Sequence, residues 1–219
     1  GVVQEPQTGQ VLAMVGSKDY WDDSIDVRVN VAVRLRQPGS SIKPITFVTA
    51  LEQGIPPSAF LWDVPMERLT PIGLYTPQNY DETFHGPVRL REALANSYNI
   101  PALKLLERVG VTNMIETANR MGIASLDPAS DRYGLSLTLG GGEVTLLEMA
   151  TAFSTFANGG LVVQPHPILA IRSSSGDRLY TLEEEKAALD AAPRAVSAES
   201  AYIVSSFLSD NAARTPAFG

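Results

Sequence analysis

The sequence predicts an α+β fold in which β-hairpins precede and follow a run of helices. Two apolar stretches, residues 2–4 and 10–15, flank a turn containing Pro6 and Gly9, a pattern typical of a β-hairpin. In the middle of the chain, prolines in opening turns and closing glycines indicate helices. With 219 residues, 44% of them hydrophobic, the chain can bury a core as one or two domains.

The segment before Ser40 is predicted to be extended, and the segment after it helical. Apolar residues occupy every second position from Val27 to Leu35, which indicates a strand with one buried face. The helix is predicted over residues 40–54. Pro44 fits only in its first turn, so Ser40 is expected at its N-terminus and Gly54 at its end. A polar, proline-rich loop is expected from there to Gly86.

Capping patterns predict the remaining elements. A capping box from Thr145 to Glu148 predicts a helix through Ala157, and Ser197 is expected to cap the last helix. The other expected elements are helices over residues 88–96, 101–109, 112–121 and 198–209 and a hairpin joining residues 168–172 to 178–181. Residues 214–219 are expected to form neither helix nor strand. We expect the protein to continue beyond both ends of the chain.

Composition excludes several functions. The net charge of −7 and the pI of about 4.9 argue against nucleic acid as a partner. Arg28, Arg34 and Arg36 are interpreted as the solvated face of the predicted strand. The chain has no cysteine, which excludes disulfides and thiol catalysis. No run reaches the roughly 18 apolar residues of a membrane span.

Ser40 and Lys43 place a hydroxyl and an amine one helical turn apart on the same face. An amine can activate a serine only when it is neutral, so burial or nearby positive charge must lower the lysine pKa from its usual value near 10.4. The positive end of the helix dipole favours the same change. Taken alone, the pair is also typical of a serine N-cap followed by a solvated lysine.

Ser97 and Asn99 offer a second hydroxyl and an amide at a corner between two predicted helices. These groups suit the relay of a proton and the binding of a carbonyl group. Two side chains that cap the turn would show the same pattern. A literal Ser-Asp-Asn also occurs at residues 209–211, where we interpret it as a helix C-terminus.

The two histidines do not indicate a metal site. His85 follows Phe84 and precedes Gly86, while His166 lies between prolines, and neither has the spacing of a metal-binding motif. A Ser-His-Asp triad stays formally open, because triads are defined by geometry. The sequence lacks the Gly-x-Ser-x-Gly turn that would support one.

Several stretches in order resemble one family, the class A (bifunctional) penicillin-binding proteins. The segment Arg36-Gln-Pro-Gly-Ser-Ser-Ile-Lys-Pro44 resembles their nucleophile motif. The segment Gly86-Pro-Val-Arg-Leu-Arg-Glu-Ala-Leu-Ala-Asn-Ser-Tyr-Asn-Ile-Pro-Ala102 resembles their second motif with its flanking helices. Residues 5–16, 143–150 and 156–160 are also similar to this group. The likeness therefore covers nearly the whole chain.

The third family motif, Lys-Thr-Gly or Lys-Ser-Gly, is absent from the chain. The four lysines have other neighbours, and Arg214-Thr-Pro216 is no substitute. In the family, this motif lies on a strand that follows the last helix and borders the active site. We therefore expect residues 1–219 to be the N-terminal and central part of one transpeptidase domain. The remaining strands are expected from a second chain or a continuation.

The resemblance implies a penicillin-binding/β-lactamase-like fold, with a central antiparallel sheet covered by helices and its final strands missing here. It implies a serine D-Ala-D-Ala transpeptidase that cross-links peptidoglycan stem peptides and is acylated by β-lactam antibiotics. Ser40 is then the nucleophile and Lys43 its proton acceptor. Ser97 passes a proton to the leaving amine, and Asn99 positions the substrate and the lysine. No metal or organic cofactor is implied.

Other members of the same fold remain as alternatives: a D-Ala-D-Ala carboxypeptidase, a β-lactamase or a penicillin sensor. A non-catalytic cell-wall scaffold is a further alternative. The sequence shows no convincing deacylating glutamate motif, which argues against a β-lactamase. The parent protein is expected to be membrane-anchored and to act on the extracytoplasmic face of the bacterial cytoplasmic membrane.

Overall fold

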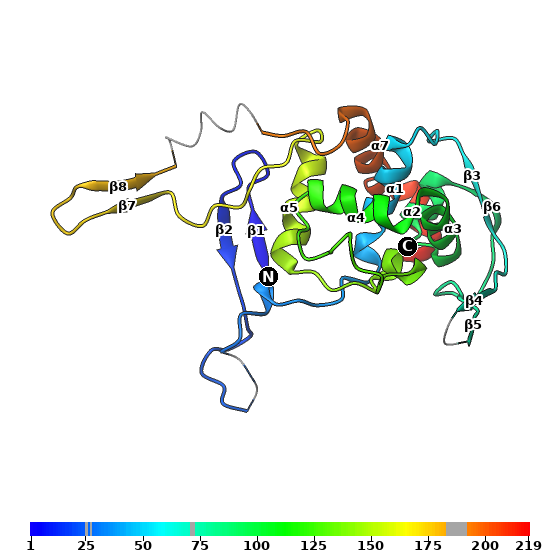
Figure 1. Cartoon of the computed structure of the whole chain (residues 1–219), viewed down its shortest axis with the longest axis horizontal. Helices are drawn as coiled ribbons and strands as arrows, with labels where there is room; N and C mark the ends of the chain where they lie inside the picture. Colours follow the sequence, from blue (N-terminus) through cyan, green and yellow to red (C-terminus); the bar gives the residue numbers. More distant parts are fainter. Residues whose placement is uncertain (25, 27, 71–72, 183–191) are drawn as a thin grey trace.

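Helix α1 (Lys43–Glu52) runs through the helical body of the molecule, and helices α2, α3, α4 and α7 pack against it (Figure 1). The computed structural model describes residues 1–24, 26, 28–70, 73–182 and 192–219. Residues 43–50 of α1 are buried, so almost the whole circumference of this helix faces protein. A helix that is apolar on all sides is stable only in such a place. The core therefore forms directly behind the turn that carries Ser40.

The helices predicted in the middle of the chain are confirmed, with small shifts in their ends. They are α2 (Leu90–Ala95), α3 (Asn99–Val109), α4 (Val111–Arg120), α5 (Leu146–Ala157) and α7 (Ala198–Leu208). The capping box at the start of α5 is present, because Thr145 and Glu148 satisfy each other's backbone N–H groups. Ser197 caps α7 as predicted by accepting a hydrogen bond from the Ser200 N–H.

Both predicted hairpins are confirmed. Strand β1 (Val2–Gln4) pairs antiparallel with β2 (Val11–Met14), and β1 lies against α5. Strand β7 (Ala170–Arg172) pairs with β8 (Arg178–Thr181) in a hairpin that projects from the helical body in Figure 1. Every strand pair among the described residues is antiparallel, and each forms a separate two-stranded sheet.

The prediction of a strand between Val27 and Leu35 is wrong. Residues 31–33 form a 3₁₀ turn, η1 (Val31–Val33), and the Asn30 side chain accepts a hydrogen bond from the Ala32 N–H at its start. Alternation favours a strand only where a neighbouring strand supplies hydrogen bonds and buries one face. No described strand pairs with this segment, and asparagine offers a local hydrogen bond instead. Residues 25 and 27 lie outside the described residues.

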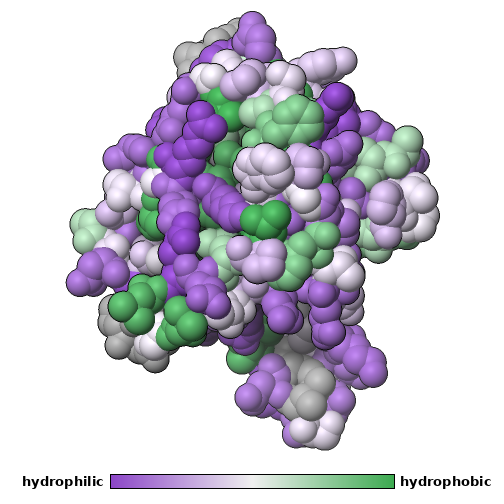
Figure 2. All heavy atoms as spheres, turned by 90° about the vertical axis from the view of Figure 1, so that its right-hand side faces the viewer, coloured by the Kyte–Doolittle hydropathy of each residue, from purple (hydrophilic) through white to green (hydrophobic). Residues whose placement is uncertain are grey.

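The loop expected up to Gly86 contains short strands. Strand β3 (Phe60–Asp63) pairs with β6 (Gly86–Arg89), and β4 (Arg68–Thr70) pairs with β5 (Gly73–Tyr75). Because β6 includes Val88, the helix predicted from that residue begins only at Leu90. Strands of three or four residues between prolines carry too little periodicity to be recognised. Figure 2 shows this side of the molecule, where hydrophobic groups are interspersed with hydrophilic ones.

The C-terminal segment, expected to be irregular, forms helix α8 (Asn211–Phe218). Asp210 caps it by accepting from the Ala213 N–H, so the Ser-Asp-Asn at residues 209–211 is a corner between α7 and α8. Asn96 holds α8 against α2 through hydrogen bonds with the backbone of Ala213 and Ala217. This helix was not predicted because it contains an internal proline, Pro216, which normally interrupts a helix. Among the described residues, no helix has the length and apolar character needed to cross a bilayer.

Candidate active site

Ser40 lies in a 3₁₀ turn, η2 (Gly39–Ile42), directly before α1. The helix was predicted to begin at Ser40, but it begins at Lys43. The reason is Pro44: it has no N–H, so it cannot make the α-helical hydrogen bond to the Ser40 carbonyl. The Lys43 N–H bonds that carbonyl instead, with the shorter 3₁₀ spacing. Ser40 is consequently an exposed residue one turn ahead of a buried helix.

A glycine contact fixes the backbone next to Ser40. Gly140, with φ of 98°, ends the 3₁₀ helix η3 (Leu135–Leu139) and lies against Gly39. A Cβ atom at residue 140 would lie 2.4 Å from the Gly39 nitrogen, so any other residue there would displace the turn. Behind this contact, the hydroxyls of Thr46 and Thr138 share a buried hydrogen bond of 2.7 Å. Sequence reasoning missed Gly140, although three consecutive glycines were a usable signal.

Lys43 is buried and hydrogen-bonded. Its side chain is only 1% exposed, and Nζ donates to the Ser97 carbonyl at 2.5 Å, to Ser97 Oγ at 3.1 Å and to Asn99 Oδ1 at 2.8 Å. All three acceptors are uncharged, so no carboxylate offsets the loss of water around the ammonium. Burial therefore lowers the pKa of Lys43 from 10.5 to about 7. The sequence-based expectation of a lowered lysine pKa is confirmed, with burial as its cause.

The corner between α2 and α3 presents Ser97 to this lysine. Ser97 has a φ of 57°, a left-handed conformation that is uncommon for residues other than glycine. This conformation lets both the carbonyl and the hydroxyl of one residue reach Lys43 Nζ. Asn99 is the first residue of α3 and reaches the same amine through its amide oxygen. Three of the four predicted site residues are therefore in direct contact.

Ser40 shares a cavity with Ser97, the residue that binds Lys43. Ser40 and Ser97 both line a space of about 270 Å³, together with Phe153 and, from α8, Arg214 and Phe218. Within the described part of the chain, the Ser40 hydroxyl makes no hydrogen bond. The site thus combines an unengaged hydroxyl, an amine with a pKa near neutrality and a second hydroxyl bound to that amine. This combination suits nucleophilic attack by serine.

His85 belongs to a separate cluster of hydrogen bonds. His85 Nδ1 lies 2.6 Å from Asp63 Oδ2 and Nε2 lies 3.1 Å from Asp81 Oδ2, and no hydrogen bond joins His85 to Ser40. A Ser-His-Asp triad built on Ser40 is therefore not formed. Over the described ranges, no cluster of three or more histidine, cysteine, aspartate or glutamate side chains could hold a metal ion.

Comparison with known proteins assigns the chain to the penicillin-binding class. A family model described as the penicillin-binding protein transpeptidase domain matches residues 1–216. Penicillin-binding protein 1A of Neisseria cinerea is 35% identical over 224 residues, and that of Rickettsia bellii is 32% identical over 219. The chain belongs to the penicillin-binding protein transpeptidase family, and these two relatives are class A members.

These two alignments cover 95% of this chain and 27% of each relative, so the chain spans about a quarter of their length. The crystal structure of penicillin-binding protein 1A from Haemophilus influenzae superposes with a TM-score of 0.81 at 30% identity, covering 94% of this chain and 34% of that one. A Mycobacterium tuberculosis penicillin-binding protein A, solved as an imipenem acyl-enzyme, superposes with a TM-score of 0.77 over 94% of this chain and 55% of its own. Its identity of 23% supports the fold alone.

Proposed function

We propose that this chain carries the acylating half of a D-Ala-D-Ala transpeptidase that cross-links peptidoglycan stem peptides. The observation that carries the proposal is the buried Lys43 amine, held by Ser97 and Asn99 one turn from the exposed Ser40. Uncharged acceptors and burial leave this amine free to lose its proton near neutral pH. That property distinguishes it from a solvated lysine beside a helix cap.

In the first half-reaction, Ser40 Oγ attacks the carbonyl of the penultimate D-alanine, and its proton passes to neutral Lys43. The tetrahedral intermediate collapses when the C–N bond breaks. Ser97, hydrogen-bonded to Lys43 Nζ, passes the proton to the leaving D-alanine amine. The product is an ester between Ser40 and the shortened stem peptide.

In the second half-reaction, an amine from a neighbouring stem peptide attacks the Ser40 ester. Lys43 and Ser97 take up the proton that the amine loses and return it to Ser40 Oγ as the ester bond breaks. A new amide cross-link forms and the serine is regenerated. A β-lactam follows only the first half-reaction: Ser40 opens the ring amide, and the ring nitrogen takes the proton.

The proposed transpeptidase also needs a strand on the side of the cavity opposite Ser40. In this chain, α8 places Arg214 and Phe218 beside Ser40, and no described strand borders the cavity. We propose that strands from outside residues 1–219 complete the antiparallel sheet and bring a Lys-Thr-Gly or Lys-Ser-Gly motif to within a few ångströms of Ser40. Together with the Ser40 N–H, this strand would form an oxyanion hole. The parent protein is proposed to be membrane-anchored on the extracytoplasmic side.

Mass spectrometry tests the proposed function. When the full-length protein is incubated with a penicillin and digested, we expect one covalent adduct, on the peptide containing Ser40. Fragmentation should place it on Ser40 and not on Ser41, whose hydroxyl is bonded to the Pro38 carbonyl at 2.7 Å. The absence of an adduct, or an adduct on another residue, would contradict the proposal.

The pH dependence of acylation tests the role of Lys43. Because the neutral amine is the active form, the acylation rate should rise with pH through the lysine pKa of about 7 and then level off. At pH 6, about one-tenth of the plateau rate is expected, since about one-tenth of the amine is then neutral. Folding stability should rise at higher pH, from about 7 toward the ordinary lysine pKa of 10.5, because in that window the folded chain has lost this proton and the unfolded chain keeps it. A rate independent of pH between 5 and 9 would rule this out.

A further inference from the structure

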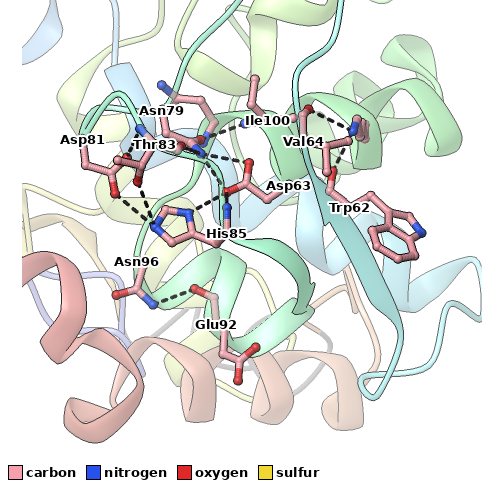
Figure 3. Close-up of polar contacts among 12 residues, drawn as sticks. Trp62, Asp63, Val64, Asn79, Asp81, Thr83, His85, Glu92, Asn96 and Ile100 are labelled. Atoms are coloured by element: carbon pink, nitrogen blue, oxygen red, sulfur yellow. Dashed lines mark hydrogen bonds and ion pairs between the residues drawn. The ribbon is translucent and has the colours of Figure 1, made fainter.

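Asn79 is a buried side chain, and every polar atom of its amide is engaged. It lies in the loop between β5 and β6 and is 4% exposed. Its Nδ2 donates to both oxygens of Asp63, at 2.9 and 2.8 Å, and to the Thr83 carbonyl at 2.9 Å (Figure 3). Its Oδ1 accepts from the backbone N–H groups of Asn99 at 2.7 Å and Ile100 at 3.2 Å. These bonds cross from the loop to the first turn of α3.

The start of α3 depends on this loop for its capping. The residue before the helix, Tyr98, makes no capping hydrogen bond with its side chain. The first N–H groups of a helix need acceptors, because they have no partner within the helix. Asn79 supplies an acceptor from a position 20 residues earlier. It therefore determines where the backbone of Asn99 lies.

The same loop orients the Asn99 side chain. Asn99 Nδ2 donates to the Gln78 carbonyl at 2.8 Å, which leaves Oδ1 facing Lys43 Nζ. An amide turned the other way would set two donors against each other at the lysine. Gln78 and Asn79 thus hold both the backbone and the amide of the residue that binds Lys43.

Asp63 anchors this arrangement from β3. Its carboxylate is completely buried and accepts from Asn79 and from the His85 N–H at 3.0 Å, and it pairs with His85 Nδ1. The His85 ring stacks on Tyr98, with ring centroids 4.0 Å apart and planes 18° apart. Tyr98 is the middle residue of the corner that carries Ser97 and Asn99. The carboxylate therefore holds two side chains that contact this corner at separate points.

We propose that Asp63 and Asn79 are positioning residues for acylation, which hold the Ser97–Asn99 corner at hydrogen-bonding distance from Lys43. They act through Asn99 and Tyr98 and do not touch the reacting groups. The inference rests on the proposed acylation of Ser40. Sequence reasoning assigned both residues to an irregular loop, so only their contacts identify them.

Stopped-flow acylation of the full-length protein by a fluorescent penicillin tests this role. Asn79→Ala removes the acceptor for α3 and the donor to Asp63. We expect its acylation rate constant to fall at least tenfold, while the dissociation constant of the non-covalent complex changes less than threefold. A role confined to stability would lower the melting temperature and leave the acylation rate of the folded protein unchanged.

Two control variants separate these outcomes. Val109→Ala creates a cavity at the far end of α3, about 15 Å from Asn99 at 1.5 Å per residue, and is expected to lower the melting temperature without slowing acylation. Tyr80→Ala changes a fully exposed neighbour of Asn79 and should change neither. The inference is overturned if Asn79→Ala acylates within twofold of the parent. The inference is also overturned if Val109→Ala slows acylation as much as Asn79→Ala does.

If Asn79→Ala does not fold, the proposal can be tested by exchanging the side chains of Asp63 and Asn79. Asp63→Asn sets an NH₂ group against a donor, and Asn79→Asp sets two carboxylates side by side, so each should slow acylation. The double variant restores a donor–acceptor pair between the two positions and should acylate at least threefold faster than the slower single variant. A double variant no faster than either would refute the proposal. Failure of the parent to be acylated would instead refute the proposed function.

Discussion

Replacing Ser40 with alanine is expected to abolish covalent labelling by penicillin completely. The two other serine hydroxyls beside this cavity are engaged: Ser97 is bonded to Lys43, and Ser41 is bonded to the Pro38 carbonyl. The fold should not suffer, because Ser40 is exposed and its hydroxyl makes no hydrogen bond among the described residues. Such surface substitutions change the free energy of unfolding by about 0.5 kcal/mol or less.

The measurement is gel fluorescence after labelling, paired with a melting curve of each variant. Ser41→Ala is the matched control: it is expected to keep labelling at Ser40, more slowly if loss of the bond to Pro38 loosens the turn. Labelling that survives Ser40→Ala in a folded protein would assign the nucleophile to another residue.

Replacing Lys43 with arginine should lower the acylation rate by a factor of about 10³ or more, in the range that general-base catalysis contributes. The guanidinium stays protonated at every accessible pH, so it cannot accept the proton of Ser40. Its planar group also cannot reproduce the three hydrogen bonds that Lys43 Nζ makes to Ser97 and Asn99. Arginine carries the charge of the protonated lysine at every pH, so the variant tests whether charge alone can support acylation.

Acylation kinetics over a pH series provide the measurement. Lys18→Arg is the control, because Lys18 is an exposed lysine outside the site; its acylation rate should stay within about threefold of the parent. If Lys43→Arg acylated at a near-parental rate, the lysine would only organise charge, and another base would be needed.

Short-range signals explain which parts of the fold could be predicted. Two helices begin with caps that use contacts within one turn: Thr145 with Glu148 in one, and Ser197 in the other. Such caps can be predicted from the sequence. The Ser97–Asn99 corner was predicted for the same reason. The strand predicted from Val27 failed because a strand needs a partner, and alternation along one segment does not provide it.

The candidate site was also predicted only in part. The spacing of Ser40 and Lys43 placed a hydroxyl and an amine one turn apart, and the resemblance added Ser97 and Asn99 as their neighbours. From the sequence we could infer that the lysine pKa must be lowered. The burial that lowers it could not be predicted. That burial depends on helices packing around α1 from several parts of the chain.

By itself, the sequence determined the α+β class and the order of the helices before α8, because caps and helix ends depend on contacts between residues close along the chain. Only the tertiary structure decided that Asn79 caps α3 from another loop and that Gly140 leaves room for the turn before Ser40. Both contacts join segments far apart in sequence, and either residue alone looks like an ordinary loop residue. Their roles arise only when folding brings a specific partner to within a few ångströms.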